Sequence, residues 1–316
     1  MSRAGRLGLI RRLAERVSQV ARSSQNATGR RILLLGKTGQ VGWELERTLA
    51  PLGEVLALDL PEIDLADADG VRRLVRDTRP EIIVNAAAYT AVDRAETEPG
   101  LAMAVNGIAP GILAEEAKAL RACLIHYSTD YVFDGEKGQP YIETDEPNPI
   151  NVYGKTKLAG EQAIQAVGAP YLILRTSWVY SLRADSFVNK VLRWAREQET
   201  LRVVSDQVGS PTWARMLAEV TGLVLARGVE YVEERKGLYH LAGGGYASRF
   251  EWAKAILDLE PRRDEQIVKK ILPASTSDFP TPARRPSFPA LDCSSFERCF
   301  GLSLPGWQDS LRLAMA

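Results

Sequence analysis

A tyrosine and a lysine are four residues apart in the segment Tyr153-Gly-Lys-Thr-Lys157. In a helix, side chains at this spacing lie on the same face, so the phenol and the ammonium would be neighbours. A free phenol has a pKa of about 10 and exchanges protons poorly at neutral pH. A cation held beside it favours the phenolate, so we expect the pKa of Tyr153 to fall. The pair is therefore predicted to exchange a proton with a substrate oxygen.

A second polar group, Ser128-Thr129-Asp130, precedes this pair and follows an apolar run at residues 123–127 that is typical of a buried strand. The Thr129 hydroxyl is expected to hydrogen-bond a carbonyl oxygen, and Asp130 to accept a bond from a substrate hydroxyl. A turn held by its own side chains is the alternative. The order of a hydroxyl, then Tyr153, then Lys157 favours catalysis.

A glycine-rich turn lies near the start of the chain. Gly36, Gly39 and Gly42 separate an apolar strand expected at 31–35 from a helix expected at 43–52. Glycines here let a dinucleotide pyrophosphate approach the N–H groups at the helix start. The spacing differs from Gly-x-Gly-x-x-Gly, and a plain strand-to-helix turn is the alternative.

Asp59 favours the cofactor interpretation. It follows a second expected strand, at 54–58, where an acid accepts hydrogen bonds from an adenosine ribose. The acid would repel a 2′-phosphate and so favours NADH, whereas nearby Lys37 leaves NADPH open. After a third strand comes Asn-Ala-Ala-Ala-Tyr-Thr, at 85–90, whose small residues let a cofactor lie against the backbone. Close packing of the strand end on a helix is the alternative.

Strands and helices alternate along the first half of the chain. Strands are expected at 31–35, 54–58, 82–84, 123–127 and 171–174, and helices at 43–52, 67–78, 107–120 and 153–167. This alternation predicts an α/β fold with a doubly wound, parallel, Rossmann-type sheet. Further on we expect helices at 186–198, 213–226 and 248–257, strands at 201–204 and 239–241, and an ordered loop at 276–289.

Three parts are expected along the chain. Residues 1–30 form a basic N-terminal extension, either solvated, which we favour, or an amphipathic or targeting helix. A dinucleotide-binding domain covers 31–175 and includes about 200–227. A smaller substrate-binding lobe takes up most of 176–316 and covers the carboxyl edge of the sheet.

Composition excludes several classes of function. The 316 residues hold 40 Lys plus Arg and 40 Asp plus Glu, so no net field attracts nucleic acid or anionic lipid. No apolar run is long enough to span a bilayer. The three cysteines lack zinc spacing and the two histidines argue against a metal site. A soluble cytoplasmic protein is expected.

Longer motifs extend this interpretation. They lie at residues 36–44, 90–93, 126–130, 151–154, 175–180, 206–207 and 281–286. Together they resemble the dTDP-4-dehydrorhamnose reductase family of the extended short-chain dehydrogenase/reductases, from about residue 31 to the C-terminus. The resemblance implies an enzyme of dTDP-rhamnose biosynthesis. It would reduce the C4 ketone of dTDP-4-dehydro-L-rhamnose to dTDP-L-rhamnose, with NADPH or NADH as the hydride donor.

The resemblance also implies roles for individual residues. Tyr153 would be the proton donor, Lys157 would hold the cofactor ribose and lower the pKa of Tyr153, and Thr129 would hydrogen-bond the reacting oxygen. The cofactor would contact Tyr153, Lys157, Gly36, Gly39, Gln40, Val41, Gly42, Asp59, Asp64, Leu65, Ala88, Tyr89 and Thr90. The substrate would contact Thr129, Asp130, Trp178, Arg284 and Arg285.

Two of these substrate assignments have structural alternatives. The Trp178 indole offers a flat apolar wall for the deoxysugar, or simply fills the core. Arg284 and Arg285 would grip the nucleotide diphosphate, or belong to a solvated basic loop.

The chain departs from the family in two places. The stretch after Asp59 is short, which weakens the assignment of Asp64 and Leu65. Family members that use magnesium hold it at a dimer interface through acids. Glu44 matches one of them, but Arg215 stands where another is expected and would repel a cation. We therefore expect no metal site, and a monomer or homodimer without bridging magnesium.

Other functions stay open. A related nucleotide-sugar reductase would act on another ketosugar, and an epimerase would retain tightly bound NAD and re-reduce its own intermediate. The regulatory subunit of methionine adenosyltransferase also resembles this family and keeps a Tyr-Gly-Lys-Thr-Lys run. Thr129, Asp130 and Trp178 match the reductases instead.

Overall fold

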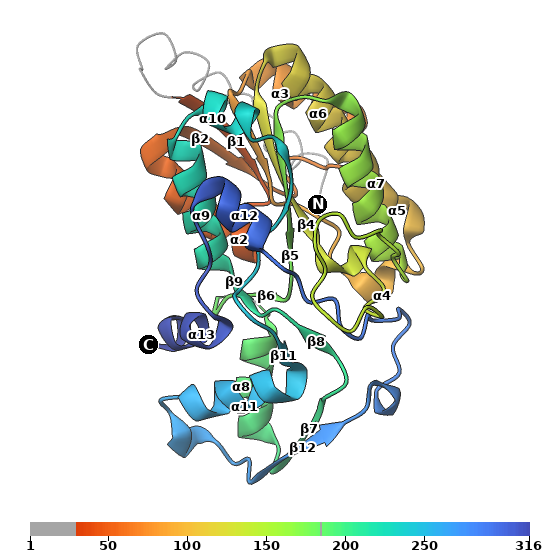
Figure 1. Ribbon diagram of the computed structural model, residues 1–316, viewed down its shortest axis with the longest axis vertical. Helices are drawn as coiled ribbons and strands as arrows, with labels where there is room; N and C mark the ends of the chain where they lie inside the picture. The colour runs from red at the N-terminus through yellow and green to blue at the C-terminus, as the bar shows by residue number, and fades with distance from the viewer. Residues whose placement is uncertain (1–29, 184) are drawn as a thin grey trace, which may run out of the picture.

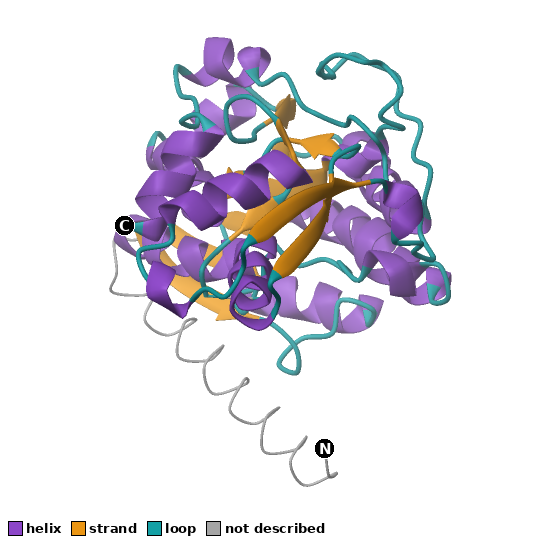
Figure 2. Cartoon of the chain, turned by 90° about the horizontal axis from the view of Figure 1, so that it is seen from below, coloured by secondary structure: helices purple, strands orange, loops and turns teal. Residues whose placement is uncertain are grey.

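A six-stranded sheet forms the centre of the computed structural model, which describes residues 30–183 and 185–316. The strand order is β10-β5-β4-β3-β1-β2, and every neighbouring pair is parallel. Helices cover both faces of the sheet (Figures 1 and 2). The predicted doubly wound Rossmann-type sheet is therefore confirmed. Apart from Arg30, the predicted N-terminal extension lies outside the described residues.

The strands of this sheet lie close to the predicted positions. They are β1 (Arg30–Leu35), β2 (Gly53–Leu58), β3 (Ile82–Asn85), β4 (Cys123–Thr129), β5 (Tyr171–Thr176) and β10 (Gly237–His240). Alternate residues of β1 enter opposite cores, because side chains alternate across a strand. Ile32 and Leu34 join one apolar layer, and Leu33 and Leu35 join the other.

Two sets of helices supply the outer surfaces of these layers. The set around the first layer is α2 (Gln40–Leu49), α9 (Ala214–Ala226), α10 (Val229–Glu234) and α12 (Ser294–Phe300). The set around the second is α3 (Ala68–Thr78), α6 (Ala109–Leu120) and α7 (Val152–Val167). Two short helices, α4 (Val92–Ala95) and α5 (Pro99–Met103), were not predicted, and a π-helix (Ala104–Ile108) joins α5 to α6.

A smaller lobe lies beyond the carboxyl edge of the sheet (Figure 1). It contains α8 (Phe187–Glu197), α11 (Arg249–Leu259) and α13 (Trp307–Met315), and the parallel pair β7 (Thr200–Val204) and β12 (Lys270–Ala274). Short strands β6 (Val179–Tyr180), β8 (Val208–Gly209), β9 (Thr212–Trp213) and β11 (Ala247–Ser248) line the connections. An apolar cluster around Trp252 and Tyr180 forms the core of the lobe.

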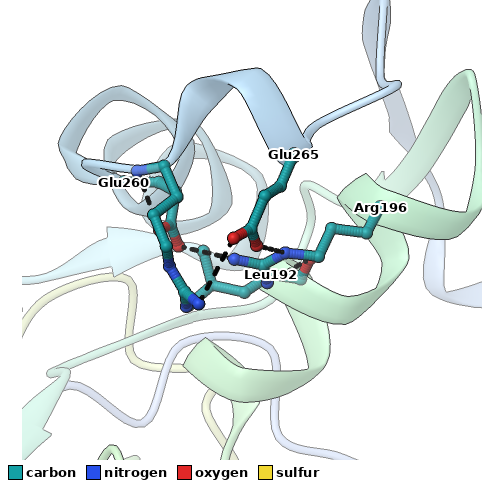
Figure 3. A network of polar contacts seen from close by, with 5 residues as sticks. Leu192, Arg196, Glu260 and Glu265 are labelled. Atoms are coloured by element: carbon teal, nitrogen blue, oxygen red, sulfur yellow. Dashed lines mark hydrogen bonds and ion pairs between the residues drawn. The ribbon is translucent and has the colours of Figure 1, made fainter.

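A polar network ties two helices of the lobe to the turn that follows them (Figure 3). Arg196 of α8 donates to the Leu192 carbonyl at 3.1 Å and to Glu265 at 2.8 Å, and its guanidinium is 3.4 Å from Glu260. Glu260 is only 3% exposed, so its charge is balanced inside the lobe by this guanidinium.

Two segments lie partly or wholly in another part of the fold than the one expected from the sequence. Within 200–227, β7 pairs with β12 in the lobe, whereas α9 packs on α2 beside the sheet. The strand expected at 239–241 is β10, which extends the central sheet next to β5. The division into a cofactor domain and a substrate lobe stays a prediction. Within 30–183 and 185–316, no helix is long and apolar enough to cross a membrane.

Candidate active site

A cavity of about 850 Å³ opens between the carboxyl edge of the sheet and the lobe. Its walls come from the ends of β1 to β5 on one side and from α8 and α11 on the other. This volume is within the range of cofactor and small-molecule sites, and the edge is where parallel sheets bind ligands. Most of the predicted site residues line this cavity.

The glycine turn forms one end of the cavity. Gly36 has a φ of +89°, and a Cβ there would lie 2.6 Å from the Ala87 nitrogen, so only glycine fits. Gly36, Gly39, Gln40 and Val41 line the cavity. Gly42 does not, because it faces the Gly36 carbonyl, where a Cβ would come within 1.8 Å. Gly42 therefore brings α2 close to the turn.

Asp59 lies beside this turn and is held by it. Its carboxylate accepts bonds from the Thr38 nitrogen at 3.0 Å, the Thr38 hydroxyl at 2.5 Å and the Leu60 nitrogen at 2.8 Å. Asp64 and Leu65 also line the cavity. Lys37 forms an ion pair with Glu62.

The segment after β3 contributes Ala88 and Thr90 to the cavity, but not Tyr89. The Tyr89 hydroxyl donates instead to Glu98 at 2.5 Å. The buried Asn106 side chain accepts from the Tyr89 nitrogen at 2.8 Å and donates to its carbonyl at 3.1 Å. Asn106 thus fixes the backbone of this segment, while the tyrosine hydroxyl contacts Glu98 outside the cavity lining.

Tyr153 and Thr129 both line the cavity, and the Thr129 hydroxyl acts on the Tyr153 phenol to lower its pKa. Thr129 also donates to Asp130 at 3.0 Å. Burial raises the pKa of Tyr153, and Lys157 is not among the groups that shift it. The predicted fall in the pKa of Tyr153 is therefore wrong for this arrangement, because desolvation of the phenolate raises the pKa, Asp130 and Tyr131 raise it further, and only the Thr129 hydroxyl lowers it.

Lys157 lines the same cavity one helical turn further on, but its amine contacts β4. Nζ donates to the Tyr127 carbonyl at 2.6 Å and is 3.1 Å from His126 Nε2. Burial lowers the pKa of Lys157 to about 8, although Glu161 acts in the opposite direction. Tyr153 and Lys157 both line the cavity, but the helical spacing did not indicate this buried contact with His126.

The lobe side of the cavity holds Asp130 and Trp178. Asp130 is 2% exposed and accepts from the Ser177 hydroxyl at 2.6 Å, and burial raises the pKa of Asp130 to about 6. Trp178 adopts a φ of +42° and packs on Gly209, where a Cβ would lie 2.5 Å from the indole. Trp252 stacks beside it, with ring centroids 5.7 Å apart.

Arg249 is a cavity residue that the sequence did not indicate. It is the first residue of α11, and its guanidinium lies 4.0 Å from the centre of the Trp178 ring and 5.0 Å from that of Phe187. It makes no ion pair with a carboxylate of the described chain. The apolar wall expected from Trp178 is thus overlaid by a cation. The chain offered no signal for it, because α11 carries no motif.

Arg284 and Arg285 lie outside the residues that line the cavity. Arg285 pairs with Asp93 at 2.9 Å and donates to the Ala283 carbonyl at 2.9 Å. The Arg284 carbonyl accepts a bond from Asn151 at 2.8 Å. Asn151 also caps α7 by accepting from the Gly154 nitrogen, so this loop is anchored to the helix that carries Tyr153.

Glu44, considered above as a magnesium ligand, lies in cationic surroundings on α2. Burial raises the pKa of Glu44, while Arg215, Arg47 and Arg183 lower it. Arg47 and Arg183 each lie 3.3 Å from the centre of the Trp43 ring. Over the part of the chain that the structure describes, no cluster of three or more His, Cys, Asp or Glu side chains is arranged to hold a metal ion.

Comparison with known proteins identifies the family to which the chain is similar. The model of the RmlD substrate binding domain matches residues 30–316. The dTDP-4-dehydrorhamnose reductase of Shigella flexneri is 45% identical over 282 residues, which cover 88% of this chain and 94% of that protein.

Two solved structures agree with this match. They are dTDP-4-dehydrorhamnose reductases from Clostridium acetobutylicum and, in complex with NADP, from Bacillus anthracis, at 35% and 34% identity. Both have a TM-score of 0.83 and cover 90% of this chain and 98% of their own. The chain belongs to the dTDP-4-dehydrorhamnose reductase family of Rossmann-type oxidoreductases.

Proposed function

We propose that this protein reduces the C4 ketone of dTDP-4-dehydro-L-rhamnose to dTDP-L-rhamnose, a step of dTDP-rhamnose biosynthesis. Its relatives from Shigella flexneri and Clostridium acetobutylicum are dTDP-4-dehydrorhamnose reductases, which supports this substrate. The observation that carries the proposal is one cavity that is lined by the glycine turn, by Tyr153 and by Thr129. That combination suits the transfer of a hydride and a proton to a carbonyl group.

The residues of the turn fit a nicotinamide dinucleotide. Gly36 and Gly42 let the turn pack closely on neighbouring backbone, because a Cβ at either position would clash with it, and Asp59 lies beside the turn. Gly39, Gln40 and Val41 would hold the pyrophosphate, and Asp59 the adenosine ribose, with Ala88 and Thr90 along the cofactor. NADPH or NADH would supply the hydride. The complex of the Bacillus anthracis relative with NADP supports NADPH.

Tyr153 is the proposed general acid. A donor has to keep its proton until negative charge develops on the substrate oxygen, and burial, which raises the pKa of Tyr153, favours the protonated phenol. Thr129 would hydrogen-bond the same oxygen and hold it in line with the phenol. Lys157, one turn along α7, would hold the nicotinamide ribose.

The lobe side of the cavity would bind the nucleotide sugar. Asp130 would accept a hydrogen bond from a sugar hydroxyl, and Trp178 would form the wall beside the sugar. Arg249 supplies a guanidinium that forms no ion pair with a carboxylate of the described residues, although the Asp130 carboxylate raises its pKa, and a guanidinium suits the diphosphate. Arg284 and Arg285 stay candidates for contacts with the outer part of the nucleotide.

The test is consumption of NADPH or NADH with the ketosugar, and mass analysis of the product. Replacing the acid in Tyr153→Phe should lower kcat by about 10²- to 10⁴-fold and leave cofactor affinity within about 3-fold. Tyr246→Phe is the matched control, because the Tyr246 side chain is exposed and outside the cavity. Normal turnover by the Tyr153 variant would show that another group donates the proton.

The same assay separates the alternatives. An epimerase would convert its sugar without net oxidation of added cofactor, and a related reductase would prefer another nucleotide ketosugar. A regulatory subunit would give no turnover and would capture a synthetase partner.

A further inference from the structure

Three buried side chains form a line of polar contacts next to the cavity. Asn85 of β3 and His126 of β4 are paired in register on neighbouring strands. Asn85 Nδ2 lies 3.1 Å from His126 Nδ1, and His126 Nε2 lies 3.1 Å from Lys157 Nζ. Each of the three is at most 1% exposed, so their polar atoms have to be satisfied by one another.

The backbone of Ala87 settles where the imidazole proton lies. Its N–H can only donate, and it donates to Asn85 Oδ1 at 3.2 Å. The Asn85 amide group, Nδ2, therefore faces His126 and donates to Nδ1. A neutral imidazole that accepts on Nδ1 carries its proton on Nε2. Burial lowers the pKa of His126 well below its ordinary value, so the ring is neutral.

The proton on His126 Nε2 favours the neutral form of the Lys157 amine. The Nε2–H of His126 points at Nζ, and an ammonium has three donors and no acceptor. A charged Lys157 would thus oppose one donor with another. A neutral amine accepts from His126 through its lone pair and still donates to the Tyr127 carbonyl at 2.6 Å. Only the neutral amine satisfies both contacts.

The charged groups around Lys157 allow this state. The ionisable groups that contact or act on Lys157 are His126 of β4 and Glu161 of α7. The Glu161 carboxylate raises the pKa of Lys157, but Arg175 of β5 holds that carboxylate in an ion pair at 2.6 Å. Burial outweighs the remaining attraction and brings the pKa of Lys157 down to about 8.

We propose that His126 is a positioning residue that holds Lys157 as a neutral amine at alkaline pH, and that Lys157 then takes one proton from solvent when a nicotinamide dinucleotide binds. The proposal rests on the proposed function, in which Lys157 contacts the cofactor ribose. The cofactor diphosphate is anionic and the ribose hydroxyls can accept hydrogen bonds, so both favour the ammonium. Cofactor binding is then linked to proton uptake.

The tautomer can be measured on the full chain without cofactor. The protein has only two histidines, so long-range ¹⁵N–¹H spectra contain two imidazoles. His126 should carry its proton on Nε2 near pH 9, where Lys157 is neutral. His240 should carry it on Nδ1, which lies 3.0 Å from the Tyr141 carbonyl, and serves as the internal reference. An Nδ1–H tautomer or a charged ring at His126 would overturn the proposal.

Proton uptake is measured by calorimetry of NADPH binding in buffers of different ionisation enthalpy. Because the pKa of Lys157 is about 8, uptake should approach one proton near pH 9 and vanish near pH 6.5. In His126→Gln the amide oxygen can accept from the ammonium, so uptake near pH 9 should fall below half. Lys157→Met should abolish uptake, and the exposed Lys155→Met should retain it.

The outcomes separate this proposal from the proposed function. Binding of NADPH without uptake near pH 9 would overturn the role of His126 and leave the reductase assignment in place. The same uptake in wild type and His126→Gln would also overturn it, because a merely structural histidine would not set the charge of Lys157. Absence of any cofactor binding would overturn both.

Discussion

At the scale of single residues, burial in the cavity shifts three ionisable groups toward their uncharged forms. Burial raises the pKa values of Tyr153 and Asp130 and lowers that of Lys157, and in each case the charged form is the one destabilised. A hydride transfer to a ketone creates negative charge on one oxygen. Neutral donors placed around that oxygen respond to this charge more strongly than they would in water.

Burial also lowers the pKa of Arg249, but a guanidinium stays charged, and this leads to a prediction about the substrate. If its guanidinium meets the diphosphate, Arg249→Met should raise KM for the ketosugar about 10- to 100-fold and leave kcat within about 3-fold, since the contact is remote from the reacting carbon. Steady-state kinetics at saturating NADPH would measure this. Arg249→Lys should recover part of the loss.

Two comparisons make that result specific. Lys254→Met removes an exposed cation from the same helix and should change neither parameter. Inhibition by dTDP should weaken in Arg249→Met far more than inhibition by thymidine, because only the diphosphate carries the charge. Equal weakening of both would contradict a contact with phosphate.

At the scale of elements, the closest approach in the cofactor region is between α2 and the turn after β1. A Cβ at Gly42 would lie 1.8 Å from the Gly36 carbonyl, so Gly42→Ala has to push the helix away from the turn. We expect at least 10-fold weaker NADPH binding and a loss of about 2 kcal/mol in the free energy of unfolding. Fluorescence titration and urea denaturation would measure these.

Gly100→Ala is the matched control for this prediction. Gly100 also lies in a helix, α5, but nothing lies within 4 Å of a Cβ built there. Its substitution should leave NADPH binding unchanged and stability the same or slightly higher, because alanine restricts the unfolded chain. Equal losses in both variants would mean that helix glycine content matters, and not the contact with Gly36.

Local sequence signals were enough for the elements that carry short-range chemistry. The glycine turn, Asp59 after β2 and the Tyr153–Lys157 pair all lie within one strand-turn-helix unit or one helical turn, so their geometry follows from spacing. The alternation of elements likewise predicted the parallel sheet, because few topologies accommodate it.

Residues brought together by tertiary structure were not predictable in this way. Arg249 reaches the cavity only because α11 of the lobe packs against Trp178. The contact between His126 and Lys157 depends on how α7 lies on β4. Arg285 was expected at the substrate and instead pairs with Asp93, a partner 192 residues away. Such contacts leave no period or motif in the sequence.

At the scale of the whole molecule, the burial of apolar side chains offsets the unfavourable free energy of burying these polar groups. Two apolar layers enclose the sheet, and a third fills the lobe. Between them lie groups that would be more stable in water, including Asp130, which is 2% exposed. The stability of the whole chain should therefore increase when such a group loses its charge.

The last prediction follows from the sign of this effect. The pKa of Asp130 is raised to about 6 in the folded chain, against about 3.9 for an unfolded aspartate. The folded state thus favours the protonated acid, and the stability that this contributes is present below pH 4 and lost as the pH rises through 6. Asp130→Asn, which stays neutral, should exceed wild type by about 2 kcal/mol at pH 8, with the difference shrinking toward pH 5.

Urea denaturation at several pH values between 5 and 8 would measure the difference. The asparagine amide can still hydrogen-bond the hydroxyls of Ser177 and Thr129, so the gain should not be offset by a lost contact. The exposed Asp77→Asn is the control and should show no such trend. If the Asp130 variant gained no stability at pH 8, or gained the same stability at every pH, burial of the Asp130 carboxylate would not be what destabilises the folded chain. A stable variant with little turnover would instead mean that the site keeps a costly charge because the sugar needs it.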